Sequence, residues 1–382
     1  MRNLKTEFLL DPSIIFLNHG SYGACPRAVF DVYQDWQRQL EHQPVEFLSR
    51  RAPDLLAHAR EELAIYLNVE SDEVVYFPNP TTALNMVARN LDLKPGDEIL
   101  TTNHEYGAMD RTWRFICKET GAKYIQQKVS LPVSTKGEFI EKLWDGVTPK
   151  TKIIFLSHIS SPTALIFPVK EICELARSVG LVSIIDGAHA PGQIPLDLIE
   201  IGADVYSGAC HKWMCAPKGA AFLYARREIQ SMLDPLVVSW GYESEEPSLS
   251  QFIDYHEWQG TRDLAAFLSV PAAIRFQLDH DWESIRKDCH DLASWTREKL
   301  IDTIGGEAIS PNSNKWFSQM FAACLPQGID PDEFKTHLYQ DYRIEALAHS
   351  WDGAPLIRVS FQAYNDQYDA DALIIAIKNI LN

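Results

Sequence analysis

The sequence predicts an α/β protein in which a mostly parallel sheet is followed by a smaller α+β domain. Short apolar runs such as residues 181–185, rich in β-branched side chains, are typical of strands buried on both faces. These runs alternate with segments of helical periodicity, and this order favours parallel strands joined by right-handed crossovers. The pattern changes near residue 279, so we expect three parts, over residues 1–40, 41–278 and 279–382.

The composition is that of a folded globular protein with an acidic surface. The chain has 382 residues, of which 46% are hydrophobic, enough for a sizeable core and about two to three domains. A formal net charge of −17 argues against nucleic acid or an anionic membrane as a partner, because both select basic surfaces.

The cysteines and the N-terminal residues indicate the cellular compartment in which the protein is expected. The seven cysteines contain no C-x-x-C pair, which is typical of reduced thiols. Acidic residues and a proline interrupt any apolar stretch at the N-terminus, and no run is long enough for a membrane helix. We therefore expect a soluble, cytoplasmic protein.

The N-terminal part contains a short strand that ends near Asn18, a glycine-rich turn over residues 19–23 and a helical segment over 26–40. Glycine lets the backbone of such a turn approach a ligand closely. A turn without any ligand fits the same pattern, so the residues alone leave both interpretations open.

Thr81 and Thr82 open another helical segment, directly after a strand expected over residues 72–77. Residues 60–67 have the periodicity of the end of an amphipathic helix. A strand, two hydroxyls and a helix N-terminus form an anion site, because free N–H groups and the helix dipole point to one place. A threonine N-cap without a ligand is the alternative.

An aromatic side chain follows the strand expected over residues 98–102. Tyr106 and, less favourably, His104 stand where a ring can stack on a flat ligand, although either can instead pack against the following helix. Further elements are a strand over 152–158, a helix over 169–179 that Gly180 ends, and a strand over 219–226, expected to be the last of the sheet.

Asp186 and Lys212 each follow a predicted strand, over residues 181–185 and 204–207. The carboxyl ends of such strands form the edge of an open sheet where ligands bind. A desolvated lysine is a nucleophile suited to Schiff-base chemistry, and a carboxylate can keep a pyridine nitrogen protonated. The pair therefore indicates pyridoxal phosphate (PLP), whose protonated ring accepts electrons. A surface lysine and a turn aspartate would leave the threonine anion site unexplained.

The C-terminal part differs from the sheet that precedes it. Thr261 stands before a long helical segment that reaches residue 279, and it is either the N-cap of that helix or a ligand-binding residue. Beyond it we expect a helix over residues 282–303, strands over 316–325 and 355–361, and a closing helix over 370–381.

Two motifs, Asp186-Gly187-Ala188-His189 and His211-Lys212-Trp213, resemble the cofactor signature of the class V aminotransferase family of PLP enzymes, in particular its isopenicillin N epimerase-like branch. The resemblance continues, in the family's order, in residues 18–23, 104–108, 235–242 and 357–365. It implies the aspartate aminotransferase-like fold of PLP-dependent transferases, fold type I. It also implies a homodimer that acts on a small amino-acid substrate.

The resemblance implies a role for each motif residue. Residues 1–40 would pack over the active site, 41–278 would form the large PLP-binding domain and 279–382 the small domain. Thr261 would reach the cofactor phosphate of the other subunit. The expected catalytic residues are Lys212, Asp186 and Tyr106; the further cofactor-binding residues are His189, Thr81, Thr82, His211, Ser207 and Thr261; and the substrate-binding residues are Arg358 and Asn18.

The reaction is open between several chemistries that share a carbanion at the α-carbon. An epimerase or racemase, a C–S lyase acting on cysteine derivatives and an aminotransferase all fit the family. Cysteine desulfurases carry an essential cysteine shortly before the carboxylate-binding arginine, and residues 343–357 contain none.

A metallohydrolase is the alternative from another class. His104, His158, Asp186 and His189 lie near strand ends and are residue types that bind zinc. This alternative leaves Lys212 without a role, so no metal site is expected.

Overall fold

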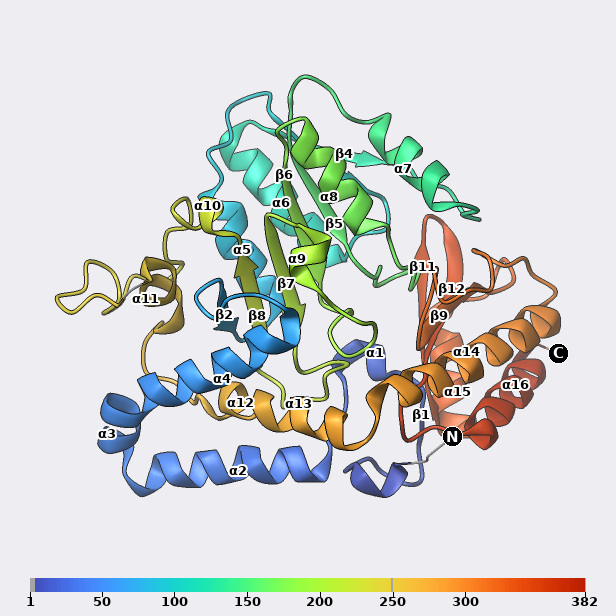
Figure 1. Ribbon diagram of the computed structural model, residues 1–382. Coiled ribbons are helices and arrows are strands. Elements are labelled where there is room, and N and C mark those ends of the chain that lie inside the picture. Colours follow the sequence, from blue (N-terminus) through green and yellow to red (C-terminus); the bar gives the residue numbers. More distant parts are fainter. Residues whose placement is uncertain (1–3, 249, 382) are drawn as a thin grey trace.

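The computed structural model describes residues 4–248 and 250–381, and its largest feature is a seven-stranded sheet (Figure 1). The strands are β2 (Val74–Phe77), β3 (Glu98–Thr102), β4 (Lys123–Gln127), β5 (Thr151–Ser157), β6 (Val182–Gly187), β7 (Val205–Ala209) and β8 (Ala221–Ala225). Their order is β2-β8-β7-β6-β5-β3-β4, and only β8 runs against its neighbours. The sheet is therefore mostly parallel, as the strand and helix order predicts.

Both faces of this sheet are buried. Ile184 and Ile185 are neighbours on β6 but belong to different hydrophobic clusters, because successive side chains of a strand point to opposite faces. Helices α5 (Pro80–Asn90) and α6 (Gly107–Thr120) cover one face, and α8 (Val169–Ser178) and α4 (Ala52–Leu67) the other. The shorter helices around the sheet are α3 (Pro44–Glu46), η2 (Phe47–Arg51), α7 (Lys136–Trp144), α9 (Leu198–Ile201), α10 (Arg227–Gln230) and α11 (Gln251–Glu257).

A second, smaller sheet lies at one side of the molecule, orange to red in Figure 1. Its antiparallel order is β11-β12-β9, and α14 packs on β9 and α16 while α15 packs on β11. The α+β character expected of the C-terminal part is thus present. Its elements are α14 (Trp282–Ile304), β9 (Met320–Cys324), α15 (Pro331–Tyr342), β11 (Leu347–Trp351), β12 (Ala354–Ser360) and α16 (Gln367–Leu381).

The N-terminal segment connects these two sheets. After η1 (Lys5–Glu7), β1 (Ile15–Phe16) pairs in parallel with β10 (Ile344–Glu345), and α1 (His19–Tyr22) follows directly. Figure 1 shows α1 between the large sheet and the C-terminal elements.

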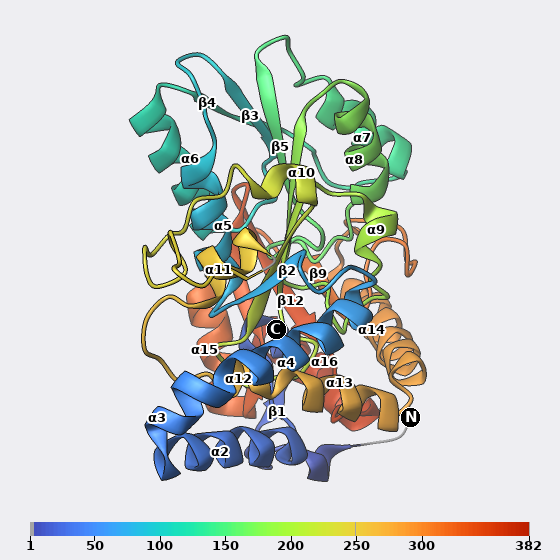
Figure 2. The ribbon, with the colours of Figure 1, turned by 60° about the vertical axis from the view of Figure 1, so that its left-hand side comes forward.

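Helix α2 (Arg27–His42) then runs along α12 (Ala265–Leu268) and α13 (Val270–Asp279), at the base of Figure 2. The long helix expected up to residue 279 is therefore interrupted. Pro271 explains the break, because its ring would clash with the carbonyl four residues earlier in a continuous helix.

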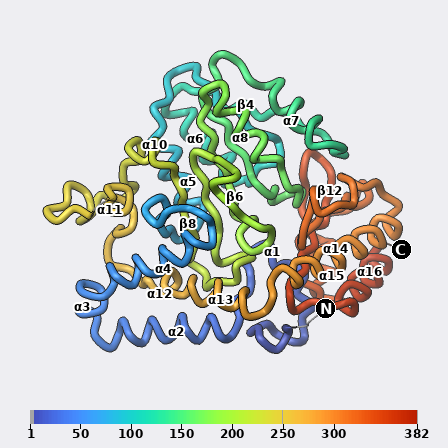
Figure 3. The backbone as a smooth tube through the Cα atoms, in the orientation of Figure 1, coloured from blue at the N-terminus to red at the C-terminus, as the bar shows by residue number. Residues whose placement is uncertain are grey.

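One segment projects from the body. Residues 231–248, between α10 and α11, extend away from the rest of the chain (Figure 3). Val238 and Trp240 within it are 69% and 87% exposed. No helix in the described part of the chain is long and apolar enough to cross a membrane.

Candidate active site

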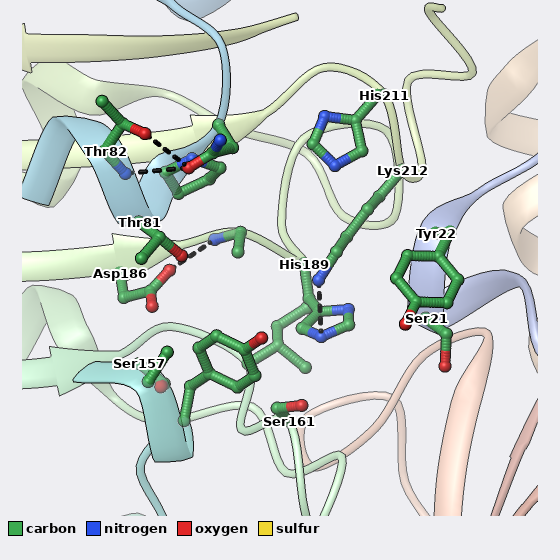
Figure 4. A pocket seen from close by; sticks show the side chains of 16 residues that line it. Ser21, Tyr22, Thr81, Thr82, Ser157, Ser161, Asp186, His189, His211 and Lys212 are labelled. Atoms are coloured by element: carbon green, nitrogen blue, oxygen red, sulfur yellow. Dashed lines mark hydrogen bonds between the residues drawn. The ribbon is translucent and has the colours of Figure 1, made fainter. Parts of the chain in front are cut away.

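A cavity of about 510 Å³ lies at the carboxyl edge of the large sheet. Ser157 and Asp186 reach it from β5 and β6, Lys212 follows β7, and the first turn of α5 supplies Thr81 and Thr82. In Figure 4 the threonines and Asp186 are on one side of the view, Ser21 and Tyr22 of α1 on the other, and Lys212 between them. Tyr106, the N-cap residue of α6, and His211 also line the cavity.

Lys212 is held close to His189. Its Nζ atom lies 3.2 Å from Nε2 of His189. Burial, followed by the nearby Arg358 guanidinium, lowers the pKa of Lys212 to about 8, although Asp186 acts in the opposite direction. A large share of Lys212 is therefore a neutral amine near pH 8, which is the nucleophilic form.

The partner of His189 supports the same protonation state. The indole Nε1–H of Trp213 lies 3.2 Å from Nδ1 of His189 and can only donate, so Nδ1 is the acceptor. Burial lowers the pKa of His189 well below its usual value, so the ring is neutral with its proton on Nε2. That proton points to Lys212 Nζ, which can accept it only as a neutral amine.

Asp186 is a buried carboxyl group without a salt bridge among the described residues. The N–H of Ala188 donates to its Oδ1 at 3.0 Å. Burial raises the pKa of Asp186, while the Ala188 bond and Lys212 favour the charged form. A protonated nitrogen brought into the cavity would therefore find an acceptor here.

The first turn of α5 borders the cavity through its two threonines. Asn79 caps the helix, because its Oδ1 accepts from the Thr82 N–H at 2.8 Å and from the Thr82 hydroxyl at 3.0 Å. The cap is thus not a threonine, and both threonines lie within the first turn. The eleven-residue helix directs its positive dipole end at the cavity, as an anion site requires.

Arg358 is a buried cation beside this cavity. It donates from Nη1 to the Ser161 carbonyl at 2.6 Å and hydroxyl at 3.1 Å, and from Nη2 to the Ser21 hydroxyl at 3.2 Å. Both serines line the cavity. Burial lowers the pKa of Arg358 to about 10, its Nε lacks a partner, and no described acidic residue pairs with it. An anionic ligand would supply the missing charge.

Four expected site residues are not among those that line the cavity: Arg358, which lies beside it, and Asn18, Ser207 and Thr261. Asn18 donates to Glu345 at 3.2 Å and accepts from Ser21 at 2.7 Å. The Ser207 hydroxyl donates to the Phe222 carbonyl at 2.8 Å. Thr261 is exposed in the turn before α12. Sequence reasoning also overlooked the lining residues Ser21, Tyr22, Ser157 and Ser161, of which only Ser21 and Tyr22 stand in a motif that had been recognised.

The residues proposed for zinc do not form one site. His104 bonds Thr163 at 3.0 Å and the Val129 carbonyl at 2.6 Å, and His158 bonds the Tyr206 hydroxyl at 2.8 Å. In the residues that the structure describes, no group of three or more His, Cys, Asp or Glu side chains is placed to hold a metal ion.

A parallel sheet with a nucleophilic lysine, a buried aspartate and a helix N-terminus at one edge is the arrangement of a PLP-dependent enzyme. The family Aminotransferase class-V matches residues 16–373. The chain belongs to this family, so it is a PLP-dependent enzyme, and the resemblance found in its motifs is confirmed.

Individual proteins agree with this assignment. Isopenicillin N epimerase of Amycolatopsis lactamdurans is 35% identical, over 99% of this chain and 98% of the relative. A probable L-cysteine desulfhydrase of Arabidopsis thaliana is 27% identical, over 97% and 84%. The structure of a cysteine desulfurase from Thermococcus onnurineus covers 100% of this chain and 98% of its own, with a TM-score of 0.86 and 20% identity. This likeness confirms the fold expected from the sequence.

Proposed function

We propose that this protein is an epimerase that inverts the amino-bearing carbon of an amino-acid-derived substrate. The observation that carries the proposal is one cavity lined by the nucleophilic amine of Lys212 and the phenol of Tyr106, with the Arg358 guanidinium, which has no described acidic partner, bonded to the lining residues Ser21 and Ser161. The 35% identity to an isopenicillin N epimerase over nearly the whole of both chains supports it.

The cofactor would be held by residues from four elements. Lys212 would supply the amine that bonds it, Asp186 would accept from its ring nitrogen, and Thr81 and Thr82 in the first turn of α5 would bind its phosphate. His189 and His211 would contact the ring, and Tyr106 would stack on it. When bound, PLP supplies an electron sink that stabilises negative charge on the carbon next to the amino group.

The substrate would be oriented by its carboxylate. Arg358 offers a planar fork of donors that matches a carboxylate in a bidentate manner. Ser21 and Ser161 already hold the two terminal nitrogens of this fork in place. A carboxylate at this position would neutralise a guanidinium that has no described acidic partner.

Inversion requires a proton acceptor and a proton donor on opposite sides of one carbon. Lys212 takes the proton from one side as a neutral amine, and Tyr106 donates its phenolic proton from the other. Between turnovers Lys212 must release the proton that it took and Tyr106 must regain one, and because Tyr106 is 45% exposed, water can carry this exchange.

A C–S lyase is the second candidate. The same amine and phenol suffice to remove the α-proton and protonate a leaving group, and a desulfhydrase relative spans 97% of this chain. A persulfide route has less support, because no cysteine lines the cavity within the described part of the chain. Transamination is the third outcome that the same site permits.

A panel of amino acids in deuterium oxide separates these reactions. The epimerase exchanges the α-proton for deuterium and inverts the centre without releasing ammonia. Release of ammonia with pyruvate identifies the lyase and contradicts the epimerase proposal. Conversion of the cofactor to its amine form identifies an aminotransferase.

Lys212→Ala tests the attachment site. We expect the variant to lose the covalent bond to PLP, so that borohydride no longer fixes the cofactor to the chain. Lys218→Ala is the matched control, because Lys218 lies six residues further along the chain but is exposed and donates to the Gly23 carbonyl at 2.8 Å. Peptide mapping that finds the pyridoxyl group on Lys218 or any other lysine would refute the assignment.

We also propose that the active unit is a homodimer with shared sites. Thr261 is exposed and absent from the lining of its own chain's cavity, as expected of a residue that serves the phosphate of a partner. The exposed apolar residues Val238 and Trp240 provide further surface for such an interface.

A further inference from the structure

Glu105 is a buried carboxyl group that the proposed reaction does not use. It follows β3 and is 5% exposed. Its Oε1 accepts from the Thr102 hydroxyl at 2.6 Å, and its Oε2 accepts from both the N–H and the hydroxyl of Ser157 at 2.7 Å. Within residues 4–248 and 250–381, no cation pairs with it in a salt bridge. A carboxyl group so placed has three donors and no counter-charge.

Ser157 connects this carboxyl group to the cofactor end of the cavity. It ends β5, where its Cα is paired with that of Asp186 on β6, and both side chains line the cavity. Paired residues of parallel strands point to the same face of a sheet. Because the Ser157 hydroxyl proton is directed at Glu105, its lone pairs are left for acceptance on the cavity side.

The charges around Glu105 are negative or neutral. The charge of Asp186 on β6 raises the pKa of Glu105, and the charge of Glu105 in turn raises the pKa of the Tyr124 phenol on β4. Burial, helped by Asp186, raises the pKa of Glu105 to about 7, whereas its hydrogen bonds oppose the rise. Above that pH Glu105 adds a negative charge beside Asp186, and this charge favours a cation in the cavity.

We propose that Glu105 is a positioning residue that acts through Ser157 to keep the Asp186 end of the cavity negative and rich in acceptors, so that it selects a cofactor whose ring nitrogen is protonated. The inference rests on the proposed binding of PLP beside Asp186. It assigns Glu105 a role in the cofactor's charge state rather than in substrate chemistry.

The test compares two ligands that differ only at the ring nitrogen. Dissociation constants are measured for PLP and for its analogue with CH in place of that nitrogen, at about pH 8.5 where Glu105 is charged. We expect the wild-type preference for PLP to fall about tenfold in Glu105→Gln, which corresponds to one pKa unit of the ring nitrogen. Ser157→Ala should lower it in the same direction.

Glu98→Gln is the matched control. Glu98 begins the same strand that Glu105 follows, is 8% exposed and accepts from the Thr148 hydroxyl, at the far end from the cavity. The inference is overturned if Glu105→Gln and Ser157→Ala keep the wild-type preference, or if Glu98→Gln lowers it equally. If the wild-type protein binds neither ligand, the proposed function fails instead. Should Glu105→Gln unfold, Ser157→Ala alone decides.

Discussion

At the scale of single residues, the site depends on buried charges that lack partners. Asp186 on β6 and Arg358 on β12 are both almost fully buried, and the described residues offer neither of them a salt bridge. A buried, unpaired charge costs several kcal/mol, so a chain keeps such groups where a ligand supplies the opposite charge. The cationic ring nitrogen and the substrate carboxylate are ligands of the required signs.

Asp186→Asn tests the first of these pairs. The amide has the size of the carboxyl group but cannot hold a proton on the ring nitrogen. We expect the variant to keep bound PLP and to lose about 10²–10³-fold in turnover, the usual effect of removing one preorganised electrostatic contact. Cofactor absorbance and steady-state kinetics measure the two quantities. Turnover close to wild type would contradict the role of Asp186.

At the scale of elements, the buried strands are the part that sequence reasoning predicts best. β3 matches its expected bounds, and β5 and β6 differ by one to two residues. Asp186 was expected just after its strand but lies within β6, since the main-chain ladder with β7 continues to Gly187. The expected end of β6 rests on the polarity of the Asp186 side chain. The observed end is set by backbone hydrogen bonds, which a polar side chain does not interrupt.

Elements with mixed polarity escaped prediction. β4, with the sequence Lys-Tyr-Ile-Gln-Gln, is an edge strand whose side chains are partly exposed, and β11 alternates irregularly between buried and exposed positions. β1 is the short strand expected before Asn18, but its two-residue partner β10 was not expected. Pairing between segments more than 300 residues apart leaves no local pattern.

The site residues also fall into those that the sequence predicts and those that it does not. Lys212, Asp186 and Thr81 were predictable because each follows a strand or opens a helix. The serines that orient Arg358 were not, because a serine acquires this role only through contacts with distant segments. Asn18 and Ser207 instead form hydrogen bonds with protein groups, Ser21 and the Phe222 carbonyl, and the motif alone does not predict these partners.

Gly23 tests how α1 supports the site. It caps α1 with φ at +72°, and an added Cβ would lie 2.9 Å from Cα of Lys212 and closer still to the His211 carbonyl. We expect Gly23→Ala to displace the backbone of Lys212 and weaken PLP affinity by about tenfold or more, the result of about 1.4 kcal/mol of misplacement.

Gly180→Ala controls for backbone strain in this experiment. Gly180 has φ at +75° but nothing within 4 Å of an added Cβ. Both variants therefore carry the cost of a side chain at positive φ, and only Gly23→Ala adds the steric conflict with residues 211 and 212. Equal PLP affinity in the two variants would show that α1 does not support the position of Lys212.

At the scale of the whole molecule, buried histidines determine the response to acid. Burial lowers their pKa values in the folded state, whereas the unfolded chain binds protons near pH 6.5. Stability from these groups is present above about pH 6.5 and is lost as the pH falls towards their folded values. The pKa is about 3 for His19 and His158, about 4 for His104, His211, His256 and His349, and well below its usual value for His189.

Unfolding by urea at about pH 7.5 and 5.5 measures this effect. We expect the free energy of unfolding to fall by about 1 kcal/mol for each buried histidine. Four carboxyl groups oppose the trend, because burial raises their pKa values and so favours the folded state at lower pH, but they are four groups against seven histidines. They are Glu105, Asp186, Glu257 and Asp369. His158→Gln should reduce this fall in unfolding free energy by the contribution of one histidine, and His58→Gln, at an exposed position, should not. Unchanged stability at pH 5.5 would contradict the prediction.

An active site shared between two subunits can be rebuilt from two chains that are each inactive. Lys212→Ala lacks the amine, and Thr261→Glu places a negative charge where the partner's phosphate is expected. In a two-fold dimer of one chain of each kind, one site combines both defects and the other has neither. A random mixture should therefore regain about a quarter of wild-type activity, since about half of its dimers are mixed and each has one intact site of two.

Thr336→Glu, at another exposed threonine, should stay active by itself. A mixture that remains inactive, or a monomer that retains PLP and activity on dilution in sedimentation, would refute the shared site.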